Sequence, residues 1–533
     1  MRNLELAGRS VARSLNGMAA TSHSLATLTA INVLQDGGNA MDAAVAACAV
    51  QGVVEPESTG IGGDCFVLYA PRGSAEIVAF NGSGRAPAAA TPAWYAEQGI
   101  DTLERYSPHS VTVPGSIDAW DRLLRDHGTR SLGDMLQPAI RFARDGYAIT
   151  ERVATDWDSE IETLSHDPAT ARIFLPGGKP PGLGKVHRQP ELAASMELIA
   201  KEGRDAFYNG SIAEDLVGHL RALGGLHSLA DFAEAEGEYV EPIKSSYRGF
   251  DIVQCPPNGQ GVIALLILNI LSGYDLASFG EFTAQRLHLE IEAMRLAYRE
   301  RDAHLADPAQ AEVPVERLLS EDYAAELRGQ IDLKRASAAP APAPVAAHAD
   351  TVYLSVVDKD RNAVSFINST FNSFGSGITG PESGVVLQNR GGAFSVDPAH
   401  PNCIAPRKRP MHTIIPGMMA KDGRAVMPFG VMGGHYQAAG HARLLTNLLD
   451  FGLDVQQSMD MPRIFALPGE GAAEVEAESG VPQETLSQLE DMGHRFCEPP
   501  KPIGGSQAIQ IDWEAGTLAG GSDPRKDGCA LGY

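Results

Sequence analysis

The sequence is poor in cysteine and in positive charge. Its six cysteines are scattered, and no pair has the Cys-x-x-Cys spacing of a zinc site or a redox motif. A disulfide framework is therefore not indicated, and reduced thiols fit a cytosol best. Lys and Arg number 43 against 67 Asp and Glu, which gives a formal net charge of −24. This charge repels phosphate backbones and anionic lipids, and argues against a nucleic-acid partner.

Long apolar segments are also missing. The N-terminal stretch "MRNLELAGRSVARSLNGMAA" lacks a continuous apolar core of signal-peptide length, and charges or glycines interrupt every later apolar run. We therefore expect a cytoplasmic protein with no membrane anchor. With 533 residues, 44% of them hydrophobic, the chain can form two domains or one large multilayer unit.

The first predicted elements are two helices within residues 24–54, joined by a turn at 36–38. The second helix is almost entirely apolar, which predicts that it is buried. A loop with glycines at 60, 62 and 63 then leads into a strand at 65–69. The loop has neither Walker nor dinucleotide spacing and precedes a strand, so close backbone packing is favoured over phosphate binding.

Residues 115–330 have a mostly helical pattern, and 282–308 read as one long amphipathic helix. In that helix His288 and Glu292 stand four residues apart on one face, a spacing that can hold a metal. No second histidine follows at a matching spacing. We therefore interpret His288 as a hydrogen-bonded structural residue, and predict neither a metal nor another cofactor.

A segment rich in alanine and proline, residues 337–349, favours extended and solvated conformations. Its simplest interpretation is an interdomain linker. Directly after it, residues 351–358 and 362–370 are rich in β-branched and aromatic side chains and flank a polar turn, which predicts a β-hairpin.

The register of this hairpin brings two hydroxyl groups together. If Asp358 and Asn362 face each other across the turn, paired residue numbers add to 358 + 362 = 720. Thr351 then lies opposite Ser369, at the strand end where the Ala/Pro segment arrives.

A threonine at the head of a strand, preceded by a chain that can swing away, suits an N-terminal nucleophile. Cleavage between Asp350 and Thr351 would place a free α-amino group, with a reference pKa of about 7.7 to 8.0, on the residue that carries the hydroxyl. That amine can act as the general base of the hydroxyl. The same hydroxyl could make the cut by attacking the carbonyl of Asp350, so that the Ala/Pro segment is the tail released at maturation.

The surrounding motifs give this hypothesis its weight. They are "GNAMDAAVAACAVQGVVEPESTGIGGDCF" (38–66), "FGSGITGPESGVVLQNRGGAFS" (374–395), "RKRPMHTIIPGM" (407–418), "FGVMGGHYQ" (429–437) and the C-terminal "GSDPRKDGCALGY". Together they resemble the γ-glutamyltransferase family of N-terminal nucleophile hydrolases, and the resemblance extends over almost the whole chain.

The resemblance implies a zymogen that cleaves itself into a large subunit, 1–350 with the flexible tail 337–349, and a small subunit, 351–533. It also implies an α+β fold, a four-layer αββα sandwich with two antiparallel sheets packed between helical layers. The two subunits come from one precursor. The sequence does not fix the oligomeric state, and a homodimer of heterodimers is one assembly compatible with it.

Four catalytic positions carry over from the family motifs. Thr351 matches the nucleophile, and Ser369 occupies the position of a second hydroxyl residue, normally threonine, that hydrogen-bonds it. Gly433 and Gly434 match the glycine pair whose N–H groups form the oxyanion hole. For these glycines a plain tight turn is the alternative interpretation.

The expected glutamyl-binding residues are replaced. Ser83 stands at the position of the carboxylate-binding arginine in "NGSGRAP", and Arg85 follows two residues later, where strand alternation would keep it on the same face. His412 and Thr413 replace a serine pair, and Phe371 an asparagine. In "NRGGAFS", Arg390 replaces a glutamine and Ala393 the aspartate that binds the ammonium group.

These replacements predict a different substrate. Without the aspartate and with Arg390 nearby, an ammonium group would be repelled. Arg85, Arg390, His412 and Thr413 instead suit a small anionic amide, and this pattern resembles the oxamate amidohydrolase branch. A γ-glutamyl transpeptidase or hydrolase acting on glutathione-like donors stays as an alternative. A non-catalytic binding homologue is a third reading, which the retained catalytic positions disfavour.

Overall fold

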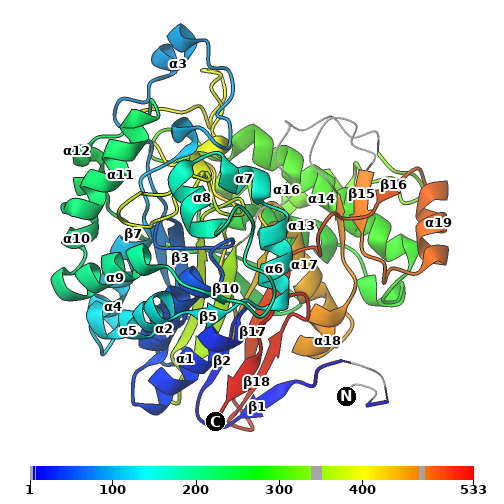
Figure 1. The fold of residues 1–533 in the computed structure, drawn as a ribbon. Coiled ribbons are helices and arrows are strands. Elements are labelled where there is room, and N and C mark those ends of the chain that lie inside the picture. The colour runs from blue at the N-terminus through cyan, green and yellow to red at the C-terminus, as the bar shows by residue number, and fades with distance from the viewer. Residues whose placement is uncertain (1–3, 6–7, 338–350, 467–473) are drawn as a thin grey trace.

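Two seven-stranded antiparallel sheets form the centre of the protein (Figure 1). The computed structural model describes residues 4–5, 8–337, 351–466 and 474–533. The first sheet has the order β1 (Ala12–Ser14), β18 (Thr517–Ser522), β17 (Gly505–Asp512), β13 (Arg424–Met432), β12 (Gly417–Lys421), β9 (Phe250–Gln254) and β8 (Ile243–Tyr247). The second has the order β19 (Ala530–Gly532), β2 (Met18–Ala20), β10 (Val352–Val357), β11 (Ala363–Ser369), β3 (Asp64–Ala70), β4 (Val78–Gly82) and β7 (Glu238–Val240).

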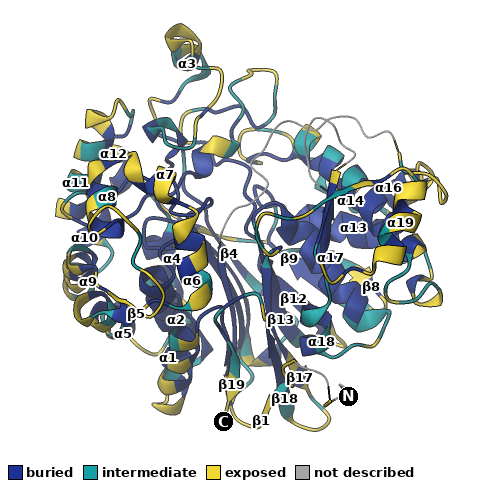
Figure 2. Cartoon of the chain, turned by 45° about the vertical axis from the view of Figure 1, so that its right-hand side comes forward, coloured by how far each residue is buried: buried dark blue, intermediate teal, exposed yellow. Residues whose placement is uncertain are grey.

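Helices cover the outer face of each sheet, as Figure 2 shows. The second sheet packs against α1 (Ser24–Gln35), α2 (Ala40–Val54) and α4 (Ser116–His127). The first packs against α13 (Gly261–Ser272), α17 (Tyr436–Leu449) and α18 (Val455–Asp460), with α14 (Ala284–His304) lying on α13.

Three large apolar clusters lie between these layers. One joins the second sheet to its helices, one joins the first sheet to its helices, and the third, which includes Phe66, Tyr353 and Met418, fills the space between the sheets. Four layers with three interfaces confirm the predicted αββα sandwich.

The remaining helices mostly extend the helical layer over the second sheet. They are α3 (Pro92–Gln98), α5 (Leu132–Asp145), α6 (Glu151–Asp158), α7 (Ile161–Ser165), α8 (Pro168–Phe174), α9 (Pro190–Glu202), α10 (Asp205–Tyr208), α11 (Ser211–Ala222), α12 (Leu229–Ala233), α15 (Val315–Leu318), α16 (Glu321–Arg328) and α19 (Gln483–Asp491). Short strands are β5 (Tyr147–Ala148), β6 (Val186–His187), β14 (Ile464–Ala466), β15 (Glu474–Ala477) and β16 (Arg495–Cys497). Within the described segments, no helix combines the length and hydrophobicity needed to cross a bilayer.

The predicted N-terminal helices are present, and each has an identifiable start. Every residue of α2 is buried, and its first turn is closed by a capping box between Asn39 and Asp42. The predicted long helix is α14, which starts after the Thr283 cap and ends at His304, so it is shorter than 282–308.

The central hairpin has the predicted register. Val352 pairs with Asn368, so that 352 + 368 = 720, and the Asp358 N–H donates to the Asn362 carbonyl at 3.1 Å. Both strands are fully buried in the middle of the second sheet, against β13 of the first.

Strands from both sides of the 350–351 bond are interleaved in each sheet. In the second sheet β10 and β11 lie between β2 and β3, and in the first sheet β18 lies between β1 and β17. The predicted tail 337–349 and Asp350 lie outside the described residues, apart from Ser337, whose N–H donates to Glu292.

Candidate active site

Thr351 and Ser369 form a buried hydroxyl pair. Thr351 directly precedes β10, and its Oγ1 lies 3.0 Å from Oγ of Ser369, the last residue of β11. Their exposed fractions are 1% and 0%. The Phe371 N–H donates to the same Ser369 oxygen at 2.9 Å, so the hydrogen of Ser369 can be donated to Thr351. The contact expected from the register argument is therefore present.

Arg390 places a buried positive charge beside this pair. It begins a short 3₁₀ helix, Arg390–Ala393. Its Nη1 donates to Thr413 Oγ1 at 2.7 Å, Nη2 lies 3.5 Å from Ser369 Oγ, and Cζ lies 4.0 Å from the centre of the Phe371 ring. Burial lowers the pKa of Arg390 to about 9, which leaves it charged at neutral pH. Its Nε has no hydrogen-bond partner among the described residues.

Asp64 is a buried carboxylate next to the hydroxyl pair. It pairs with Ser369 across β3 and β11. Its Oδ1 accepts from the N–H groups of Gly84 (2.9 Å) and Gly115 (3.2 Å) and from Gln388 (2.8 Å), while Oδ2 lies 3.0 Å from Nε2 of His412. Burial raises the pKa of Asp64 to about 6, although the Arg390 charge and these hydrogen bonds oppose the rise.

His412 and Thr413 are engaged by these two charged groups. His412 Nε2 faces Asp64, and its Nδ1 accepts the Ile414 N–H at 3.3 Å. Burial lowers the pKa of His412 well below its usual value, and Arg390 lowers it further, so the ring is neutral. Thr413 Oγ1 accepts from Arg390. Both residues therefore contact the charged pair of Asp64 and Arg390, and their direct contact with substrate stays a prediction.

The glycine pair forms a tight turn just before α17, in a backbone conformation that favours glycine. Gly433 has a φ of 117° and Gly434 a φ of 56°, and a Cβ on Gly433 would lie 2.9 Å from Cα of Gly504. The turn alternative also holds, since the Gly433 carbonyl accepts the Tyr436 N–H at 3.0 Å. The amide N–H groups of Gly433 and Gly434 take part in no hydrogen bond among the described residues.

Gln260 connects the glycine turn to the arginine side of the site. Its Nε2 donates to the Thr413 carbonyl at 2.8 Å and to the Gly434 carbonyl at 3.1 Å. A continuous set of contacts therefore runs from Gly434 through Thr413 and Arg390 to the hydroxyl pair.

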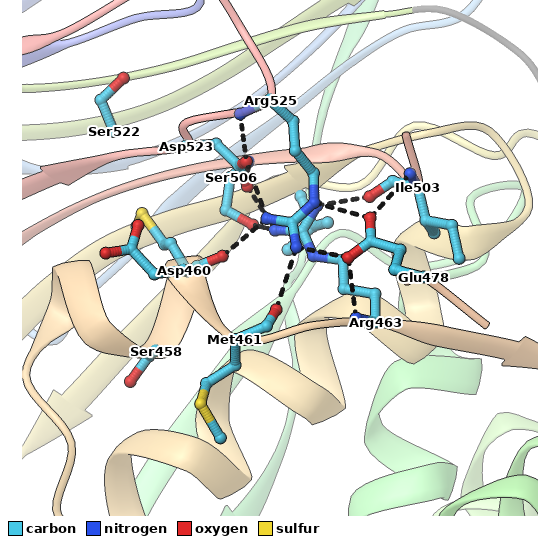
Figure 3. A network of polar contacts seen from close by, with 12 residues as sticks. Ser458, Asp460, Met461, Arg463, Glu478, Ile503, Ser506, Ser522, Asp523 and Arg525 are labelled. Atoms are coloured by element: carbon cyan, nitrogen blue, oxygen red, sulfur yellow. Dashed lines mark hydrogen bonds and ion pairs between the residues drawn. The ribbon is translucent and has the colours of Figure 1, made fainter. Parts of the chain in front are cut away.

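A buried ionic network holds the segment that packs on Gly433 (Figure 3). Arg463 forms an ion pair with Asp523 and donates to the Ile503 carbonyl at 2.5 Å, next to Gly504. Burial alone would raise the pKa of Asp523, but Arg463 and Arg525 outweigh it and the pKa lies below its usual range. The network therefore gives the glycine turn a rigid support.

Arg85 does not lie where strand alternation predicted. The strand β4 ends at Gly82, so alternation does not continue to Arg85, and that part of the prediction is wrong. Its Nη1 donates to the Arg407 carbonyl at 3.2 Å and lies 3.8 Å from Asp307. Arg85 lines a cavity of about 300 Å³ whose described lining includes Ser83 and Arg407 but neither Thr351 nor Arg390.

His288 is hydrogen-bonded, as predicted, and a second histidine lies beside it. Its Nε2 donates to the Asp332 carbonyl at 2.7 Å, and its Nδ1 lies 2.8 Å from Nε2 of His494. Sequence spacing did not reveal this second histidine, because His494 comes from the loop before β16. Ligand atoms of His288, Glu292 and His494 lie within 4.8 Å of one another.

Two site residues were missed from the sequence: Asp64 and Gln260. Asp64 had a usable signal, since an acidic residue that opens a fully apolar strand needs buried partners. Gln260 is recognised only once distant segments are brought together.

The site can now be compared with known proteins. The sequence model of the gamma-glutamyltranspeptidase family matches residues 26–533. The chain belongs to this family. Its members are hydrolases that act on amide C–N bonds.

Two relatives span nearly the full chain. The chain is 39% identical to the "Glutathione hydrolase-like YwrD proenzyme" of Bacillus subtilis, over 97% of this chain and 98% of the relative. It is 34% identical to the "Oxamate amidohydrolase proenzyme" of Klebsiella pneumoniae, over 98% and 99%. The crystal structure of a cephalosporin acylase from Bacillus halodurans superposes with a TM-score of 0.92 at 37% identity, covering 100% of this chain and 98% of that one. Family and fold are thus settled, while the named substrates differ.

Proposed function

We propose that this chain is a self-cleaving amidohydrolase with Thr351 as its nucleophile, and that it acts on a small amide bearing a carboxylate and no amino group, such as oxamate. The observation that carries the proposal is the buried Arg390 beside the Thr351–Ser369 pair. A buried guanidinium with an unpaired N–H suits an anion.

Maturation uses the Thr351 hydroxyl on its own peptide bond. Oγ1 bonds to the carbonyl carbon of Asp350 as the C–N bond breaks, which gives an ester and a free α-amino group. Water then splits the ester, leaves a carboxylate on Asp350 and restores the hydroxyl. The word "proenzyme" in the names of both relatives supports this step.

Turnover repeats the same chemistry on substrate. The hydroxyl attacks the amide carbonyl while its proton passes to the α-amino group and then to the leaving ammonia. Ser369 hydrogen-bonds the nucleophile. The unpaired N–H groups of Gly433 and Gly434, at the N-terminus of the 14-residue helix α17, receive the oxyanion. Water hydrolyses the acyl-enzyme.

The charge of the site selects the substrate. A glutamyl donor would bring an ammonium group near Arg390. Ala393 offers no carboxylate to balance it, and the oxygens of the buried Asp64 are already bound by Gly84, Gly115, Gln388 and His412. Two like charges 4 Å apart repel by about 4 kcal/mol at an effective dielectric constant of 20. A glutathione-type hydrolase remains the second candidate because of the 39% identity to the glutathione hydrolase-like relative.

The test compares two substrates. We expect ammonia release from oxamate with a kcat/KM at least ~100-fold above that for γ-glutamyl-p-nitroanilide, which is about 2.7 kcal/mol of discrimination. The double variant Arg390→Gln/Ala393→Asp should reduce the ratio of kcat/KM for oxamate to kcat/KM for γ-glutamyl-p-nitroanilide. Arg85→Gln is the comparison variant, since Arg85 has no contact with the hydroxyl pair and should alter the ratio far less. Efficient glutamyl turnover without oxamate activity would reject the proposal.

A further inference from the structure

The residue after the glycine pair, His435, is a fully buried histidine whose tautomer the structure fixes. Its Nδ1 lies 2.8 Å from Nη1 of Arg301. Arginine has only donors, so Nδ1 must be the acceptor and the ring proton must sit on Nε2. Burial lowers the pKa of His435 well below its usual value, and Arg301 and Arg390 lower it further, so the ring is neutral.

Arg301 is itself held firmly. Its side chain on α14 is fully buried, Nη2 lies 2.7 Å from Asp302, and Cζ lies 4.6 Å from the centre of the Tyr298 ring. The Tyr298 hydroxyl donates to the backbone carbonyl of His435. Both the ring and the backbone of His435 are therefore fixed by the same helix.

His435 and Arg390 each keep one unpaired donor. Nε2–H of His435 and Nε–H of Arg390 are buried and have no partner among the described residues. Leaving a buried donor without a partner is costly. Such groups are therefore expected where a ligand supplies the acceptor.

Both donor side chains lie near one residue, Phe371. The His435 ring centre is 6.2 Å from that of Phe371, and the Arg390 guanidinium carbon is 4.0 Å from it. Phe371 has a φ of 81°, a strained value for a non-glycine residue, and its N–H binds Ser369. Phe371, whose N–H is bound to Ser369, therefore combines a strained backbone with two neighbouring side chains that have unpaired donors.

We infer that His435 Nε2–H and Arg390 Nε–H together form a receptor for the substrate carboxylate, with His435 as the specificity-determining residue. The inference rests on the proposed function and adds to it a second donor. A carboxylate offers two acceptor oxygens, one for each N–H. An ammonium or a primary amide nitrogen in the same place would put its own N–H donors against those of His435 and Arg390. The receptor therefore binds only groups that can accept hydrogen bonds.

Arg301 acts as a positioning residue in this receptor. Because Arg301 can only donate to Nδ1 of His435, it prevents the other tautomer. In that tautomer Nε2 would be an acceptor and could accept a hydrogen bond from an ammonium group. The selectivity of His435 therefore depends on a residue that does not touch the substrate.

The experiment uses oxamate, its neutral relative oxamide and the dianion oxalate. His435→Phe keeps an aromatic ring against Phe371 and removes the N–H. We expect it to raise the KM for oxamate at least ~10-fold while kcat changes less than ~3-fold, and to leave the KM for oxamide unchanged. His435→Gln, which retains a donor, should restore part of the oxamate affinity. The control is His304→Phe, a half-buried histidine at the end of α14.

Calorimetric binding of oxalate to the mature proteins separates the two hypotheses. If the wild type binds oxalate at least ~10-fold more tightly than His435→Phe but releases no ammonia from oxamate, the proposed function fails and this inference stands. Equal oxalate affinity in the two proteins, or none in the wild type, overturns the inference. If His435→Phe does not fold, ¹⁵N-histidine NMR of the wild type decides, since oxalate must shift the Nε2–H resonance of His435.

Discussion

Removing the Ser369 hydroxyl isolates the contribution of the hydroxyl pair. In Ser369→Ala, Thr351 Oγ1 loses the 3.0 Å contact, and no water can replace it easily because both residues are almost completely buried. A hydrogen bond of this kind contributes about 0.5 to 1.5 kcal/mol, which corresponds to a rate reduced about 2- to 13-fold. The Phe371 N–H also loses its acceptor, so the free energy of unfolding should fall by about 1 to 3 kcal/mol.

Two assays and two companion variants make this prediction sharp. Self-cleavage is followed on denaturing gels after rapid synthesis, and turnover is followed as ammonia release by the mature protein. Ser369→Thr keeps a hydroxyl and should retain most of both rates. Ser365→Ala is the matched control, since Ser365 is equally buried four residues earlier in β11 but binds Tyr353 (2.8 Å) and the Phe429 carbonyl (3.2 Å).

The reasoning is refuted by either of two results. One is a Ser369→Ala protein that matures and turns over at wild-type rates. The other is a Ser365→Ala protein that is slowed as much as Ser369→Ala, because general destabilisation would then explain both.

Three further perturbations follow from the same geometry. Thr351→Ala should give one band near 56.5 kDa, whereas the wild type should give two, the smaller beginning Thr-Val-Tyr-Leu on N-terminal sequencing; continued cleavage of the variant would exclude Thr351 as the maturation nucleophile. Gly433→Ala should slow maturation and turnover at least ~10-fold at little loss of secondary structure by circular dichroism, since its φ of 117° and the 2.9 Å approach to Gly504 leave no room for a methyl group; wild-type rates would show that the turn is not catalytic. The pKa of Asp64 is raised to about 6, so protonation below that pH removes a negative charge near Arg390, and steady-state kinetics should show the KM for oxamate falling between pH 7 and pH 5. Over the same range kcat should fall, because the α-amino group of Thr351 is protonated. A KM that rises instead would contradict this role of Asp64.

Local sequence patterns predicted the parts of the site whose geometry depends on residues close together in the sequence. The hairpin and its register follow from strand alternation around one tight turn, and they bring Thr351 to Ser369 without any other segment. The four-layer fold followed from family resemblance, because composition and periodicity do not fix which strands become neighbours.

The errors came from contacts between distant segments. Arg85 leaves the strand because Gly84 turns into the space beside Asp64, where a Cβ would lie 1.9 Å from the Val113 carbonyl. His494 reaches His288 across 206 residues, and Arg301 reaches His435 across 134. No periodicity of 2 or 3.6 residues carries such information.

The interleaved strands have a consequence for the life of the protein after maturation. Before the cut, folding is a reaction within one chain, and every strand of both sheets is held at high effective concentration by its neighbours. With the proposed cut at Thr351, β10 and β11 would belong to a different polypeptide from β2 and β3, which flank them. The two subunits cannot separate without opening both sheets, so the mature protein should stay assembled because it unfolds slowly. Once unfolded, however, it must reassemble from two separate chains, and refolding becomes dependent on concentration. The proposed cleavage would therefore be irreversible in a second sense, because it would remove the covalent link that allowed the fold to form.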